Sequence, residues 1–152
     1  MKQNRINILN RKAKFQYEII EKYTAGIKLA GTEIKSIRAG KAGIAESFCE
    51  FHRNELYVIN MNIEEYSHAT YFNHKPKSER KLLLNKRELK KLEKEVSQSG
   101  LTIIPLRLFI NEKGFAKLDI ALCKGKKIYD KRETIKDREN KRRLDRIQKE
   151  YK

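Results

Sequence analysis

The chain has 152 residues, and its 36 Lys and Arg against 20 Asp and Glu give a net charge of +16. This length suits one domain with one modest core. The longest stretch without a charged residue, 96–106, is too short for the ~20 apolar residues of a membrane helix. The basic start, 1–12, lacks the apolar segment of a secretory signal. Two cysteines cannot form a disulfide framework, so we expect a cytoplasmic protein with reduced thiols.

The charge is unevenly distributed. Residues 124–152 carry 13 Lys and Arg against 6 Asp and Glu, which makes this end more densely positive than the rest. A pI near 9.9 indicates a polyanionic partner. Nucleic acid is the first candidate, an anionic membrane surface is the second, and a merely soluble basic protein is the alternative.

The first half of the chain predicts strands around one short helix. Alternation over 15–23 is typical of a strand. Thr32 is expected to cap a helix over 33–39, which Gly40 ends. A second strand over 47–51, a turn at 53–55 and a return strand over 56–62 predict a hairpin.

Residues 62–80 carry rings and cations without periodicity, which predicts a long loop. After it, Asn85 and Glu88 have the spacing of a capping box. The spacing of the apolar residues that follow predicts a helix through Val96, which ends before Gly100.

Two further strands predict a second hairpin. Ile104, Leu106, Leu108 and Ile110 share one parity, as do Ala116, Leu118, Ile120 and Leu122. Both apolar sets must face the core, so 110 should pair with 116. This register places Arg107 opposite Asp119 and predicts an exposed cross-strand ion pair.

Short strands with local turns favour a mainly β fold, a small antiparallel barrel or sandwich with helices at its edges. The absence of βαβ alternation argues against a Rossmann-type sheet. From Ile128 onward no single apolar stripe forms, although i,i+4 charge pairs favour a helix. We expect this tail to be frayed alone and helical on a partner. A C-terminal helix docked on the body is the alternative.

No catalytic or metal-binding pattern stands out. Cys49 and His52 would point to opposite faces of a strand, which argues against zinc. The bend at 40–43 lacks the spacing of a phosphate-binding loop, although Lys35, Arg38 and Lys41 could contact phosphates beside it. We therefore expect no enzyme activity, no cofactor and no metal.

Three segments interleave cations with aromatic rings, a pattern that favours RNA binding. They are 10–15, 71–77 and 125–132. Cations neutralise phosphates, and exposed rings stack on unpaired bases at ~1–3 kcal/mol per base. Because aromatic residues at strand parity usually belong to the core, Tyr129 and the loop rings are better stacking candidates than Phe15 or Tyr17.

Several segments in a shared order resemble the small protein B family, the partners of transfer-messenger RNA in bacterial ribosome rescue. These segments are Asn10-Arg11-Lys12-Ala13, Ala25-Gly26-Ile27, 31–42, Arg80-Lys81-Leu82-Leu83-Leu84, Gly125-Lys126-Lys127, Asp130-Lys131-Arg132 and Ile135-Lys136. The resemblance extends from Asn10 to about Arg138.

The resemblance implies an OB-like antiparallel barrel over 1–127, which binds the tRNA-like domain of transfer-messenger RNA, and a basic tail over 128–152. In that family the tail becomes helical in the empty message channel near the decoding centre of a stalled ribosome, against small-subunit ribosomal RNA. Elongation factor Tu and alanyl-tRNA synthetase act on the RNA, so they are indirect partners. The resemblance implies no catalysis and no membrane partner, and we expect a monomer. A general basic OB-fold protein that binds RNA or the ribosome is the alternative function.

The resemblance also assigns site residues. The candidate transfer-messenger RNA contacts are Asn10, Arg11, Lys12, Glu33, Lys35, Arg38, Lys41 and Lys126. The candidate ribosome contacts are Lys127, Tyr129, Asp130, Lys131, Arg132, Ile135 and Lys136. Glu33 has an equal alternative role, as a first-turn carboxylate favoured by the helix dipole. Asn140 departs from an aromatic found in some relatives, so contacts beyond Ile135 are not carried over.

Overall fold

The structure is a computed structural model that describes residues 6–69, 71–97 and 100–125. The predictions for 126–152, including the helical tail and the boundary at 127/128, lie outside the described residues. In the part of the chain that is described, no helix is long and apolar enough to cross a membrane.

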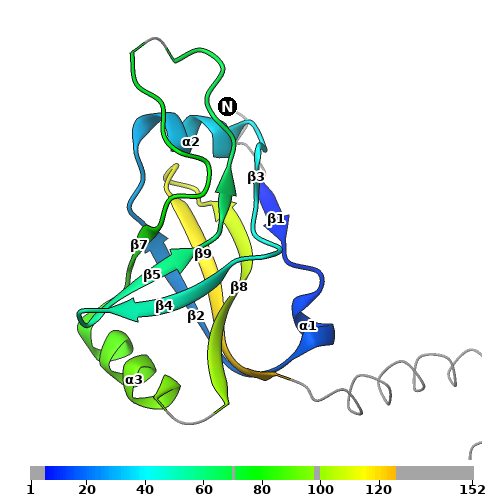
Figure 1. Ribbon diagram of the computed structural model, residues 1–152, viewed down its shortest axis with the longest axis vertical. Helices are drawn as coiled ribbons and strands as arrows, with labels where there is room; N and C mark the ends of the chain where they lie inside the picture. Colours follow the sequence, from blue (N-terminus) through cyan, green and yellow to red (C-terminus); the bar gives the residue numbers. More distant parts are fainter. Residues whose placement is uncertain (1–5, 70, 98–99, 126–152) are drawn as a thin grey trace, which may run out of the picture.

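Twelve elements follow one another along the described chain (Figure 1). They are β1 (Asn7–Leu9), α1 (Ala13–Gln16), β2 (Tyr17–Ile27), α2 (Gly31–Arg38), β3 (Ala42–Gly43), β4 (Phe48–His52), β5 (Glu55–Ile59), β6 (Asn62–Ile63), β7 (Arg80–Leu83), α3 (Lys86–Val96), β8 (Leu101–Ile110) and β9 (Ala116–Gly125).

The main sheet closes into an antiparallel barrel. Its strand order is β1-β8-β4-β5-β7-β2-β9, and β8, the second strand of this order, also pairs with β9, the last, which closes the barrel. Strands β1 and β4 pair with different parts of β8: β1 pairs with residues 107–109, and β4 pairs at Ile103. The helices flank the barrel, with α2 near one end and α3 near the other (Figure 1). The prediction of a mainly β, antiparallel fold with flanking helices is confirmed.

The predicted register of the last hairpin is confirmed. Ile110 pairs with Ala116, and Arg107 pairs with Asp119. The Arg107 Nε lies 3.0 Å from Asp119 Oδ2, and both side chains are partly exposed. The predicted ion pair is therefore present.

The single apolar face predicted for β8 is wrong, because the strand is irregular between Pro105 and Arg107. One extra residue in a strand reverses the side-chain alternation beyond it. Leu108 is fully buried in the main core, whereas Ile104 and Leu106 pack in a second, smaller cluster with Ala13 and Cys123.

Two predicted boundaries of the first half are also wrong. Phe15 lies in α1, and the strand begins only at Tyr17. The residue that caps α2 is Ala30, not Thr32. The backbone N–H of Ala30 donates to Glu33 Oε1 at 2.8 Å, whereas the side chain of Ala30 accepts nothing from the first turn, because alanine has no acceptor.

The first hairpin forms as predicted, with a tighter turn. Arg53 and Asn54 both have positive φ, 54° and 67°, which suits a two-residue turn. The return strand ends at Ile59 rather than 62, because Asn60 also has a positive φ of 66°. Beyond it, β6 pairs with β3 in a separate small sheet.

Between the two hairpins the predicted helix forms, and one further strand appears that was not predicted. Asn85 caps α3 by accepting from Glu88 N at 2.8 Å, and the chain turns at Gly100 with φ +85°. The loop covers 64–79, but β7 follows it directly and inserts between β5 and β2. This strand was not predicted, since its four residues show no alternation that stands out from the charged neighbours.

Candidate nucleic-acid interface

A turn between β1 and α1 carries the first predicted cluster. Asn10 is 9% exposed, and its backbone N donates to Leu106 O at 2.9 Å. Its side-chain Nδ2 donates to Pro105 O at 3.0 Å. The irregular point of β8 thus binds Asn10 twice and fixes the turn, while Arg11 and Lys12 remain exposed.

The end of β9 lies beside the same turn. Tyr17, one residue after α1, pairs with Gly125, the last described residue of the chain. Lys126 follows Gly125 directly and lies outside the described residues. The structure therefore brings the start of β2 and the end of the barrel domain to one place, next to Arg11 and Lys12.

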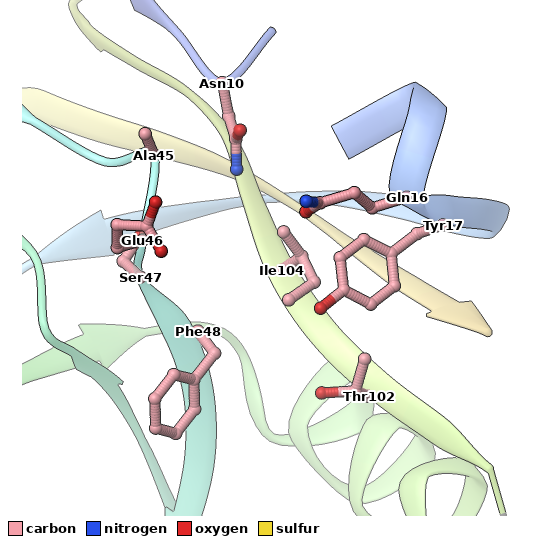
Figure 2. Close-up of a pocket in the computed structure, with 9 residues that line it drawn as sticks. All are labelled: Asn10, Gln16, Tyr17, Ala45, Glu46, Ser47, Phe48, Thr102 and Ile104. Carbon is pink, nitrogen blue, oxygen red and sulfur yellow. The ribbon is translucent and has the colours of Figure 1, made fainter. Parts of the chain in front are cut away.

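A pocket of about 210 Å³ opens beside this turn (Figure 2). It is lined by Asn10, Gln16, Tyr17, Ala45, Glu46, Ser47, Phe48, Thr102 and Ile104. The pocket therefore lies between α1, the start of β2, the segment before β4, and β8. The sequence prediction missed it because these residues come from three distant parts of the chain.

Three predicted cations gather around α2. Lys35, Arg38 and Lys41 are all exposed and line a second, open pocket of about 470 Å³ with residues 65–68 of the long loop. Lys35 Nζ lies 5.4 Å from the centre of the Tyr66 ring, within the range of a cation–π contact. The helix and the loop thus present cations beside a ring, but on a different part of the barrel from α1 (Figure 1).

Glu33 does not share this surface. It is 6% exposed, and its Oε2 lies 2.5 Å from Nε of Arg80, which is 3% exposed. Arg80 also donates to the backbone oxygens of Met61, Lys75 and Pro76 at 2.7, 3.1 and 3.0 Å. The buried pair therefore joins the first turn of α2 to both ends of the long loop.

His74 strengthens the same connection. It is 6% exposed, its Nδ1 lies 2.9 Å from Thr32 Oγ1, and its Nε2 lies 2.9 Å from the carbonyl oxygens of Ile63 and Glu64. The loop is thus anchored by a buried imidazole. The exposed rings of the loop, Tyr71 and Phe72, lie beyond this anchor.

The two thiols lie inside the barrel. Burial raises the pKa of Cys49 strongly and raises the pKa of Cys123 to about 12. Both are 5% exposed or less, so both stay protonated at neutral pH. Among the described residues no group of three His, Cys, Asp or Glu could hold a metal ion.

Apart from Glu33, which is buried, the predicted site residues fall into three sets. Asn10, Arg11 and Lys12 lie together, and Lys35, Arg38 and Lys41 lie together. The third set lies outside the described residues: Lys126, Lys127, Tyr129, Asp130, Lys131, Arg132, Ile135 and Lys136. Sequence reasoning missed the partners of Glu33, since nothing in the sequence pairs residues that lie 47 positions apart.

Closed antiparallel barrels with cations and rings on their exposed turns form a class of small RNA-binding proteins. The family model described as "SmpB protein" matches residues 7–150. The chain therefore belongs to the SmpB family, and the resemblance found in its motifs is confirmed.

Relatives and solved structures agree. The SsrA-binding protein of Christiangramia forsetii is 78% identical over 149 residues, which cover 98% of this chain and 95% of the relative. That of Flavobacterium psychrophilum is 75% identical over 146 residues, 96% of this chain and 97% of the relative. A solved chain described as "tmRNA-SmpB: a journey to the center of the bacterial ribosome" aligns with a TM-score of 0.70 and 45% identity, covering 86% of this chain and 94% of that one.

Proposed function

We propose that this protein binds the tRNA-like domain of transfer-messenger RNA and delivers it to stalled ribosomes for trans-translation in the cytoplasm. The observation that carries the proposal is membership of the SmpB family over nearly the whole chain. The protein acts as a monomer and by binding alone, with no cofactor. Elongation factor Tu and alanyl-tRNA synthetase act on the RNA that it carries.

The turn at 10–12 is the principal RNA contact of the barrel. Arg11 and Lys12 are exposed and neutralise phosphates. Asn10 is a positioning residue, because its amide holds the turn against β8. Lys126, which follows the strand end next to this turn, adds a further cation.

The α2 surface provides a second RNA contact through Lys35, Arg38 and Lys41. All three cations are exposed, and Tyr66 offers a ring beside Lys35. Glu33 holds α2 and the loop in place through Arg80, so its effect on RNA binding is indirect. The burial of the Glu33 carboxylate favours its role in the first turn of α2 over a direct contact with RNA.

The tail over 128–152 contacts the ribosome rather than the transfer-messenger RNA. Its residues Tyr129, Asp130, Lys131, Arg132, Ile135 and Lys136, with Lys127 at the junction, act at the decoding centre and in the empty message channel. The denser positive charge of residues 124–152 supports this division between the barrel of 1–127 and the tail.

Filter binding tests the RNA contact. Arg11→Ala and Lys12→Ala should weaken binding to the tRNA-like domain and reduce the salt slope by up to ~0.7–0.9 each. Arg87→Ala and Lys90→Ala, which remove exposed cations of α3, are the matched controls and should leave the slope unchanged. Equal affinity of the wild type for the tRNA-like domain and for a duplex of the same length would instead favour a general RNA-binding protein.

Truncation tests whether the barrel and the tail bind different partners. A variant that ends at Tyr129 should bind isolated transfer-messenger RNA nearly as well as the full chain but should support no tagging on stalled ribosomes. Loss of RNA binding in this variant would contradict the two-site arrangement.

A further inference from the structure

The pocket beside Asn10 contains an unsatisfied buried acceptor. Asn10 Nδ2 donates to Pro105 O, and this bond fixes the orientation of the amide, because a carbonyl can only accept. The other end of the amide, Oδ1, is buried and has no hydrogen-bond partner within the described chain. Such an atom is costly to leave unpaired, so the pocket favours a ligand that donates a hydrogen bond to it.

The other walls of the pocket combine polar ends with rings. Figure 2 shows the amide of Gln16 and the hydroxyl groups of Tyr17 and Thr102 turned toward the same space. The rings of Tyr17 and Phe48 lie on two sides of the opening, and Phe48 is 36% exposed. This combination fits a flat, aromatic, polar-edged ligand.

From this arrangement we infer that the pocket binds one unpaired nucleobase that carries an exocyclic amino group. The inference rests on the proposed function, since the base belongs to the RNA that Arg11 and Lys12 hold beside the pocket. A phosphate does not fit, because Glu46 lines the wall. A purely apolar side chain does not fit either, since it would leave Asn10 Oδ1 without a donor.

The acceptors of the pocket select among bases. An amide oxygen such as Asn10 Oδ1 and a carboxylate such as that of Glu46 are hydrogen-bond acceptors. Adenine, cytosine and guanine each carry an amino group with two N–H donors, which can serve both acceptors, whereas uracil has only N3–H to donate and presents a carbonyl oxygen where cytosine has its amino group. The pocket therefore discriminates against uridine.

Ring removal is the first test. The full chain is titrated with a tRNA-like-domain transcript, and Phe48→Ala should weaken binding about tenfold or more through lost stacking. Phe115→Ala removes a ring that is 62% exposed outside this pocket and is the matched control, with binding within twofold of wild type. Urea unfolding of both variants identifies any loss that comes from instability. Equal effects of the two substitutions would overturn the proposal.

Base replacement is the second test and gives the sharper result. Each unpaired nucleotide of the transcript is replaced in turn by uridine. One position should lose affinity with the wild type and lose much less with Phe48→Ala or with Glu46→Gln, an exposed residue whose replacement leaves the core intact. Tolerance of uridine at every position, or a loss of the same size in the variants, would refute the pocket. In either case, a higher affinity of the wild type for the tRNA-like domain than for duplex would still support the proposed function.

Discussion

Replacing the buried carboxylate of Glu33 by an amide, in Glu33→Gln, should destabilise the barrel strongly while it leaves the exposed surface almost unchanged. The carboxylate accepts from the Ala30 N–H at 2.8 Å and from Arg80 Nε at 2.5 Å. An amide has only one acceptor oxygen, so one of these two donors would face an N–H₂ group. The guanidinium of Arg80, 3% exposed, would also lose its counter-charge.

The magnitude follows from burial. Removing one partner of a buried ion pair costs about 3–5 kcal/mol, because the remaining charge stays desolvated. That is a large share of the ~5–15 kcal/mol that a domain has in total. At roughly 3–5 °C per kcal/mol for a domain of this size, the melting temperature should fall by about 10–20 °C.

The assay is urea and thermal unfolding followed by circular dichroism. Glu21→Gln is the matched control, since Glu21 pairs with Lys91 at 2.8 Å on the surface, and its unfolding curves should nearly overlay those of the wild type. RNA affinity is measured at a temperature where both variants are folded.

The decisive comparison is between stability and affinity. If Glu33 acts through Arg80, folded Glu33→Gln should bind RNA within a few-fold of wild type despite its lower stability. A variant of wild-type stability that binds RNA poorly would refute the reasoning and would make Glu33 a direct contact.

Three further predictions concern the barrel alone. Asn85→Ala should cost about 1 kcal/mol in urea unfolding, because it removes the cap of α3, and no change would show that the cap is dispensable. Asp119→Asn should cost under ~1 kcal/mol, since its pair with Arg107 is partly exposed, and a larger loss would contradict that assignment. Burial raises the pKa of Cys49 and that of Cys123, the latter to about 12, so the folded state keeps protons that the unfolded chain releases near pH 8.5. The two thiols should therefore add no pH dependence to the free energy of unfolding below that pH. Above about pH 9, each thiol should lower the free energy of unfolding by up to ~1.4 kcal/mol per pH unit. Replacing both by Ala should flatten this fall between pH 8 and pH 10, and an unchanged slope would exclude the thiols as its cause.

Local patterns predicted the hairpins well. The matched apolar alternation of β8 and β9 predicted the pairing of Ile110 with Ala116 and the position of Arg107 opposite Asp119. Asn85 was correctly recognised as a cap because its partner, Glu88, lies only three residues away. These features depend on residues close in sequence, where periodicity and capping are informative.

The features that local patterns missed depend on contacts between residues that are distant in the sequence. The irregularity at Pro105 shifts Ile104 into the second cluster, and alternation alone does not reveal where a strand gains a residue. Nothing in the local sequence distinguishes Arg80 from a surface cation, yet its side chain is buried against Glu33. The pocket at Asn10 likewise depends on residues from α1, β4 and β8. Motif resemblance located the exposed cations of the candidate site but not the buried residues that position them.

The attachment of Asn10 to Pro105 bears on how a new copy of the protein is made. These two residues lie 95 positions apart, so the turn that displays Arg11 and Lys12 takes its final shape only after most of the chain has been synthesised. Strand β9, which closes the barrel against β2, emerges later still. A copy cut short by a broken message would therefore lack the finished turn and would not compete with intact molecules for RNA.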